Sequence, residues 1–180
     1  LSDYPINIMR NVARQGGPKT ADRDTVDGLS RDSDKMWAGL NGNYHTICAG
    51  LERSHSLRRF ECEDGVPVPR TVDELKKSYD ERKIFEFHHS VFPAGHTIPA
   101  LPTWFRLSTG TVPAAILATA YKSPAWEPQV ILPADAPLSD EDIPTRHGDQ
   151  QALIYELCRA GYTFAVASHV FTVHKGVKQK

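Results

Sequence analysis

The chain has 180 residues, with 21 Lys and Arg against 22 Asp and Glu, a net charge of -1 and 40% hydrophobic residues. This length suits one domain that buries a core without disulfides. The charge balance gives no bulk attraction to nucleic acid or anionic membranes, and no stretch reaches the roughly 20 apolar residues of a membrane span. The first residues lack the layout of a signal peptide, so we expect no targeting segment and no membrane contact.

The first predicted element is a helix that begins near Pro5, a residue favoured in the first helical turn. Ile6, Met9 and Val12 recur at helical spacing, which predicts an apolar face with polar residues on the other faces. A helix with no strand before it is an unusual start for an α/β domain. We therefore expect that upstream sequence is missing.

Residues 16–50 are predicted to form an irregular loop, because turn-forming residues dominate and no apolar period is sustained. Asp22 and Asp24 in this loop could reach one hard cation together, since carboxylate oxygens suit magnesium, manganese or calcium. Five aspartates fall between residues 22 and 34, so a solvated turn explains the same spacing.

In the middle of the chain, a strand is predicted over residues 57–62 and a helix over residues 71–80. Thr71 and Glu74 have the spacing of a capping box, which fixes the start of that helix. Three histidines then follow within nine residues, and these are His88, His89 and His96. They fit a polar cleft wall or ordinary packing, whereas a zinc site would need firmer spacing and a fourth ligand.

The last third is predicted as two strands around a turn, followed by a helix and two further strands. The strands cover residues 114–121, 129–132, 162–166 and 171–176, and the helix covers residues 149–160. Trp126 and Glu127 lie in the first turn and are expected to be exposed for ligand recognition. A second turn is expected near Ser168 and His169. This mixed order of elements predicts an α/β or α+β sandwich.

The most informative segment is the end of the last strand, which delivers His174 and Lys175 to a turn at Gly176. A neutral imidazole can bind a divalent cation, an ammonium can neutralise phosphate, and glycine lets backbone approach a ligand closely. A solvated strand terminus is the alternative explanation.

Taken in their order along the chain, several segments resemble glycosyltransferase family 49, which includes β-1,4-glucuronyltransferase and the second catalytic domain of the LARGE enzymes. The resemblance covers about residues 4–15 and 57–178. It is carried by residues 4–14, 126–128 and 157–176, and the version at residues 58–61 and 95–99 resembles a nematode-type branch.

The resemblance implies an α/β fold of the GT-A-like, nucleotide-sugar-binding type, with a mixed sheet flanked by helices and present here only in part. It also implies metal-dependent, inverting transfer of a sugar, glucuronic acid in the characterised family members, from a UDP-sugar donor to a glycan or glycoprotein acceptor. The expected cofactor is Mn²⁺ or Mg²⁺. Intact family members are type II membrane proteins of the Golgi, with the catalytic domain in the lumen.

Metal and donor ligands follow from the same resemblance. His174 matches the histidine that joins an Asp-x-Asp pair on the metal, for which Asp22 and Asp24 are the candidates. Lys175 and Gly176 would lie near the diphosphate. Two further candidates for the donor pocket come from the first helix, and these are Asn7 and Arg10.

The general base of an inverting transfer would take the proton of the acceptor hydroxyl. Asp140, Glu141 and Asp142 match the acidic segment that lines the acceptor side in the family, so one of them is the expected base. A loop of helix-capping acids is the alternative reading of these three residues.

One departure from the family lies before the aspartate pair, where Gly16–Thr20 replaces a hydrophobic strand. The resemblance therefore predicts a single partial, truncated domain over residues 1–180. Two functions follow: a UDP-sugar-dependent glycosyltransferase, active if Asp22, Asp24 and His174 converge, or a catalytically inactive remnant that serves as a binding or structural module.

Overall fold

A computed structural model describes residues 6–15, 25–26, 36–38, 53–109, 115–133, 135–144 and 146–178. Its elements, in chain order, are α1 (Ile6–Gln15), β1 (Thr25–Val26), β2 (Met36–Ala38), β3 (Arg53–Cys62), α3 (Val72–Asp80), β4 (Ile84–Glu86), α4 (Pro93–His96), α5 (Leu101–Ser108), β5 (Ile116–Thr119), β6 (Gln129–Leu132), α6 (Asp149–Arg159) and β7 (Thr163–Lys175). Two of the short strands, β1 and β2, fall within the stretch that was predicted to be an irregular loop.

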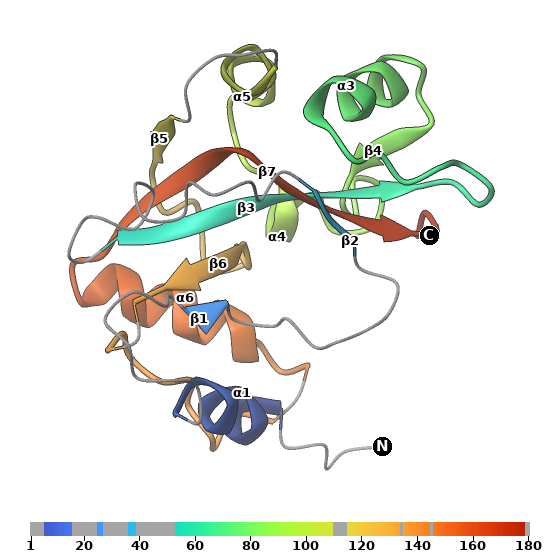
Figure 1. The fold of residues 1–180 in the computed structure, drawn as a ribbon. Coiled ribbons are helices and arrows are strands. Elements are labelled where there is room, and N and C mark those ends of the chain that lie inside the picture. Colours follow the sequence, from blue (N-terminus) through green and yellow to red (C-terminus); the bar gives the residue numbers. More distant parts are fainter. Residues whose placement is uncertain are drawn as a thin grey trace.

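The strands form one mixed sheet in the order β1-β6-β3-β7-β2, with β4 paired to β3 and β5 paired to β7. The two longest strands, β3 and β7, run parallel at its centre, and every other pairing is antiparallel. Helices α3 and α5 lie on one side of the sheet, and α6 and α1 lie on the other (Figure 1). The predicted α/β class with a mixed sheet flanked by helices is confirmed, and the arrangement is compatible with a GT-A-like fold.

Two apolar cores attach the helices to the sheet. The core under α3 and α5 centres on Phe60, Trp104 and Phe171, all fully buried. Trp104 also donates a hydrogen bond from Nε1 to the Ala167 carbonyl over 2.8 Å, so its one polar atom is satisfied. A second core packs the inner face of α6 against β6, and it includes Trp126, Val130, Leu132, Leu153, Ile154, Leu157 and Phe164.

Strand β7 corrects one prediction. The sequence predicted two strands separated by a turn near Ser168 and His169, but the structure has one strand that bulges there. Its pairing with β3 shifts between Ser56, which faces Val166, and Arg58, which faces Phe171. At the bulge, His169 adopts a left-handed backbone with φ 64°. This local change of direction is the irregularity that the sequence pattern predicted as a turn.

Helix α3 begins at the predicted cap. The Thr71 hydroxyl accepts a hydrogen bond from the Glu74 backbone N–H over 3.2 Å, as a capping box requires. Glu74 Oε2 accepts its hydrogen bond from the Arg70 N–H over 2.7 Å, one residue before the cap. Across the described ranges, the structure contains no helix with both the length and the apolar character needed to cross a bilayer.

Candidate functional site

The sheet places His174 at the C-terminal end of β7. His174 lies opposite Glu61 of β3 in the parallel register, and Lys175 lies opposite Cys62. Gly176 then turns the chain with φ 87°, a conformation that favours glycine, and its N–H donates to the Cys62 carbonyl over 2.9 Å. The side chains of His174 and Lys175 are exposed just before this turn.

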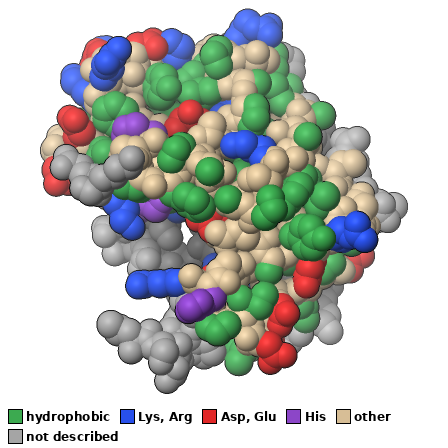
Figure 2. Space-filling model, turned by 180° about the vertical axis from the view of Figure 1, so that it is seen from behind, with side chains coloured by type: hydrophobic (Ala, Val, Ile, Leu, Met, Phe, Trp, Pro, Cys, Tyr) green, Lys and Arg blue, Asp and Glu red, His purple; other side chains and the backbone are tan. Residues whose placement is uncertain are grey.

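A cluster of rings surrounds Phe87, next to His174. The centroid of the Phe87 ring lies 3.8 Å from His88, 4.9 Å from His96 and 5.7 Å from His174. The guanidinium carbon of Arg59 lies 3.8 Å from the same centroid. We call these five residues the Phe87 cluster. Figure 2 shows a hollow at one edge of the molecule, with histidine and Lys or Arg side chains on its rim.

Backbone pairing holds Phe87 in this position. Strand β4 pairs with β3, with Phe60 opposite Glu86, and the next N–H, that of Phe87, donates to the Arg59 carbonyl over 3.0 Å. His88 follows with φ 53°, so the chain turns sharply there and returns towards α4. The histidine-rich segment that the sequence marked as a possible cleft wall is thus folded around one aromatic ring.

Two hydrogen bonds tie α4 to the turn before β6. His96 Nε2 lies 3.1 Å from Glu127 Oε1, and the Glu127 backbone N–H donates to the Gly95 carbonyl over 2.9 Å. Trp126 was predicted to be exposed, but it is fully buried because it packs against α6 and Phe164. The Glu127 side chain stays partly exposed, with 20% of its surface accessible.

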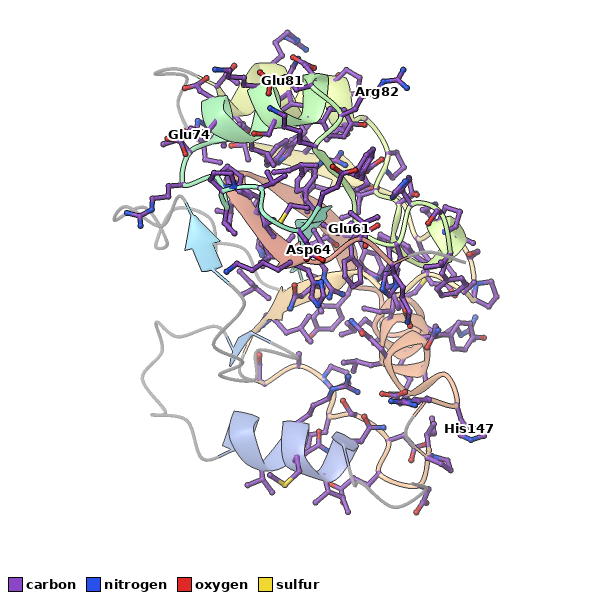
Figure 3. All side chains as sticks on the ribbon, turned by 90° about the vertical axis from the view of Figure 1, so that its right-hand side faces the viewer. Glu61, Asp64, Glu74, Glu81, Arg82 and His147 are labelled. Carbon is purple, nitrogen blue, oxygen red and sulfur yellow. The ribbon has the colours of Figure 1, made fainter. Side chains whose placement is uncertain are left out.

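A buried carboxylate lies close by. Glu61 is fully buried on β3, and its Oε1 lies 3.0 Å from His89 Nδ1 while its Oε2 accepts a 3.5 Å hydrogen bond from the Lys178 N–H. Figure 3 shows Glu61 near the middle of the molecule, whereas Glu81 lies at α3 and His147 lies towards the opposite, lower end of the view. Glu61 therefore ties the tail that follows Gly176 to the body of the protein.

Burial lowers the pKa of two members of the Phe87 cluster. The pKa of His88 falls from 6.5 to about 4, chiefly through desolvation and then through repulsion from His96. The pKa of Arg59 falls from 12.5 to about 10, again through desolvation, with the Glu127 carboxylate acting in the opposite direction. At neutral pH His88 is therefore neutral and Arg59 keeps its charge.

Within the described part of the chain, no three His, Cys, Asp or Glu side chains form a group that could hold a metal ion. The zinc alternative for the three histidines thus finds no support there. Asp22 and Asp24 lie outside the described residues.

The predicted donor-pocket residues of α1 form hydrogen bonds with other groups of the protein. Asn7 Nδ2 donates to the Asp140 carbonyl over 2.6 Å, and Arg10 Nη1 reaches Asp149 Oδ2 over 2.6 Å and Asn7 Oδ1 over 2.8 Å. Asn11 is similarly engaged with Ser139. The polar face of α1 is therefore the buried one.

This orientation leaves apolar side chains of α1 exposed to solvent. Met9 and Val12 are 49% and 56% exposed, whereas Asn7 and Asn11 are each 2% exposed. Hydrogen bonds to the segment before α6 therefore decide how the helix docks.

The acidic candidates line the segment that α1 holds. Asp140 Oδ1 accepts a 2.9 Å hydrogen bond from the Asp142 N–H, and Glu141 Oε1 accepts one of 2.9 Å from Asn11 Nδ2. All three acids are exposed. The structure thus joins Asn7 to this acidic segment and Arg10 to Asp149 at the start of α6. His174, Lys175 and Gly176 lie at the end of β7, apart from α1 (Figure 1).

Sequence reasoning missed two residues of this site. Arg59 and Phe87 carry no motif of their own, and only their pairing across β3 and β4 brings them together. The density of histidines between residues 88 and 96 was the available signal, but it does not reveal the ring at their centre.

Comparison with known proteins assigns the chain to a family. The family model described as "Glycosyl-transferase for dystroglycan" matches residues 2–180. Beta-1,4-glucuronyltransferase 1 from Danio rerio is 28% identical over 181 residues, which cover 97% of this chain and 41% of that protein. The Bos taurus protein of the same name is 26% identical over 186 residues, covering 98% of this chain and 41% of the relative.

A third relative is the xylosyl- and glucuronyltransferase LARGE2s from Gallus gallus, 26% identical over 178 residues, which cover 95% of this chain and 22% of that protein. The chain spans about two fifths of the length of the beta-1,4-glucuronyltransferase 1 relatives that it matches. With the family model aligned over nearly every residue, this chain belongs to the glycosyltransferase family described as glycosyl-transferase for dystroglycan.

Proposed function

We propose that this chain is part of a glycosyltransferase that transfers a sugar from a UDP-sugar to a glycan or glycoprotein acceptor. Glucuronic acid is the sugar that we propose. The support is the family match over residues 2–180 together with relatives that are named as glucuronyltransferases. The same proposal places the reaction in the Golgi lumen, in line with the family resemblance. An inactive remnant of the fold is the alternative that the experiment below can reveal.

The observation that carries the proposal is the presentation of His174. Its ring lies exposed at the end of β7, and its Nδ1 lies 3.4 Å from the Gly176 carbonyl. If Nδ1 carries the proton towards that carbonyl, the lone pair of the neutral imidazole lies on Nε2. No described residue forms a hydrogen bond with Nε2, so this nitrogen is available to a ligand from outside the protein.

His174 thus fits the role of a ligand for Mn²⁺ or Mg²⁺. A metal-bound histidine commonly donates its other ring N–H to a backbone carbonyl, which is the relation of Nδ1 to Gly176. Asp22 and Asp24 are the proposed partners on the same ion. When bound, such an ion neutralises the charge that develops on the departing UDP. Lys175 is exposed next to His174 and would add a positive charge for the diphosphate.

For the acceptor, we propose that the acidic segment held by α1 supplies the base. The carboxylates of Asp140 and Glu141 already accept hydrogen bonds from the protein. Asp142 is exposed, and no described residue donates a hydrogen bond to its carboxylate. Of the three acids, Asp142 is therefore the one whose carboxylate no described residue engages, and the proposal requires that the bound donor and acceptor span the space between this segment and the end of β7. In this arrangement Asn7 holds the segment through the Asp140 carbonyl, and Arg10 binds Asn7 and Asp149. Both residues also stay the proposed contributors to the donor pocket.

Calorimetric titration of the full chain with UDP, in the presence and absence of Mn²⁺, tests the proposal. We expect manganese-dependent binding by the wild-type chain and a loss of at least tenfold in affinity for His174→Ala, because one metal ligand is removed. His147→Ala is the matched control, since His147 is an exposed histidine far from β7 (Figure 3).

Equal heats for the wild type and His174→Ala would remove the metal role of His174. Absence of any UDP binding, with the far-UV circular dichroism of a folded α/β protein, would favour the inactive remnant over the transferase.

A further inference from the structure

Two neighbouring arginines of β3 have opposite surroundings. Arg58 is 2% exposed, and its guanidinium donates to the carbonyls of Ile98, over 2.7 Å, and Pro99, with Glu86 Oε1 3.4 Å from Nη1. Arg59 lies on the other face of the strand and is partly exposed. Among the described residues, however, no acceptor forms a hydrogen bond with the Arg59 guanidinium.

What holds Arg59 is the face of an aromatic ring. Its guanidinium carbon lies 3.8 Å from the centroid of Phe87, and Phe87 is fixed by its backbone bond to the Arg59 carbonyl. A stacked guanidinium uses its flat face for the ring, whereas its five N–H donors point outwards in the plane. The stack therefore orients the donors without consuming them.

The acid whose charge acts on Arg59 forms no hydrogen bond with these donors among the described residues. Glu127 is close enough to favour the charged form of Arg59, but its Oε1 is bound to His96 Nε2 over 3.1 Å. His88, stacked on the same Phe87 ring, is neutral at neutral pH. Arg59 is thus the permanent cation of the Phe87 cluster.

A cation in this setting is suited to an oxyanion. A partly buried charged group whose N–H donors have no hydrogen-bond acceptor costs free energy. A planar guanidinium can donate two parallel hydrogen bonds to the two oxygens of a carboxylate or phosphate. The cluster also contains His174, whose ring lies 5.7 Å from Phe87. Arg59 pairs with Thr172, two residues before His174 on β7, so an anion bound by Arg59 would lie on the part of the sheet that carries the proposed metal ligand.

We propose that Arg59, stacked on Phe87, forms an oxyanion-binding site that recognises a charged group of the nucleotide-sugar donor. The inference rests on the proposed function and adds a specificity-determining residue to it. The shared chemistry is an anionic group with paired oxygens. It can come from the carboxylate of a sugar acid or from a phosphate of the nucleotide.

Calorimetric titration of the full chain with UDP, UDP-glucose and UDP-glucuronate, each with Mn²⁺, tests the proposal. Arg59→Gln is expected to weaken binding by about 10- to 100-fold, the value of one charge-assisted hydrogen-bonded contact. A loss for UDP-glucuronate alone identifies the carboxylate as the anion, and an equal loss for all three identifies a phosphate. Arg59→Lys keeps the charge without the planar fork, so its loss should be intermediate.

Arg106→Gln is the matched control, because it removes the same charge from an exposed position on α5, on the other side of the sheet. Circular dichroism and thermal unfolding establish that each variant folds, and Arg59→Lys provides the comparison if Arg59→Gln does not. Affinities of the folded Arg59 variants within twofold of wild type for all three ligands would overturn the inference and leave the proposed function standing. A wild-type chain that binds none of the three would overturn both.

Discussion

The side-chain amide of Asn11 pairs with both backbone groups of Ser139, 128 residues later in the chain. Asn11 Oδ1 accepts from the Ser139 N–H over 2.9 Å, and Asn11 Nδ2 donates to the Ser139 carbonyl over 2.8 Å. Both residues are buried. The pair acts as a clamp that joins α1 to the segment carrying the acidic candidates.

Asn11→Ala should therefore lower the free energy of unfolding by about 2–3 kcal/mol, because two buried backbone groups of Ser139 lose their partner. Urea unfolding monitored by circular dichroism measures the change. Met9→Ala is the control on the same helix: Met9 is 49% exposed, and a change within about 0.5 kcal/mol is expected. A similar loss in both variants would contradict the clamp.

Arg58→Met should destabilise the protein by about 2–4 kcal/mol. The substitution keeps much of the apolar stem but leaves the carbonyls of Ile98 and Pro99 and the carboxylate of Glu86 without their cation. Denaturant unfolding measures the loss. Arg106→Met, at an exposed position on α5, should change the stability by less than about 0.5 kcal/mol.

His88 should make stability depend on pH in a defined window. Its folded pKa of about 4 lies below the ordinary 6.5, so between these values the unfolded chain binds more protons than the folded one. The contribution of His88 to the free energy of unfolding therefore falls by about 1 kcal/mol as the pH drops from about 6.5 to about 4, after allowance for the partial exposure of the ring.

His88→Asn tests this dependence, because asparagine tolerates the left-handed backbone at φ 53°. Unfolding free energies measured between pH 4 and 8 should show a shallower acid limb for this variant, whatever its absolute stability. His147→Asn, at an exposed position, should keep the wild-type slope. A His88→Asn curve parallel to that of the wild type would show that burial does not perturb His88.

Gly176→Ala should cost about 1–2 kcal/mol. An alanine Cβ would meet no atom within 4 Å, so the cost comes from the backbone at φ 87° and not from crowding. Gly176→Asn should cost less, since asparagine adopts this conformation more readily. Thermal unfolding compares the two, and a larger loss for asparagine would argue against backbone strain as the cause.

Elements with local signals could be predicted from the sequence. Thr71 and Glu74 predict the start of α3. The apolar pattern predicts the four residues of β6, Gln129–Leu132. Local signals also suggested the irregularity at His169, although as a turn instead of a bulge. In each case the information lies within a few residues along the chain.

Features that depend on distant partners could not be predicted in this way. Trp126 lies in a turn between prolines, yet it is buried because α6, which lies about 25 residues later in the sequence, packs against it. Met9 lies on an apolar stripe, yet the hydrogen-bond demands of Asn7 and Asn11 decide which face of α1 docks. For the candidate site, the sequence indicated His174 and Gly176, whereas the stacking of Arg59 on Phe87 depends on strand pairing.

The parallel pairing of β3 with β7 has a consequence for how the protein forms. The paired residues of β3 and β7 lie about 110 residues apart in the sequence, as Arg53 and Thr163 do. Bringing two such distant segments together costs chain entropy, so this pairing is expected to form slowly. During synthesis, β3 leaves the ribosome about 110 residues before β7, so its parallel partner is still missing when β3 emerges. Arg59 and His174 lie on these two strands, and they therefore come together only once this long-range pairing has formed.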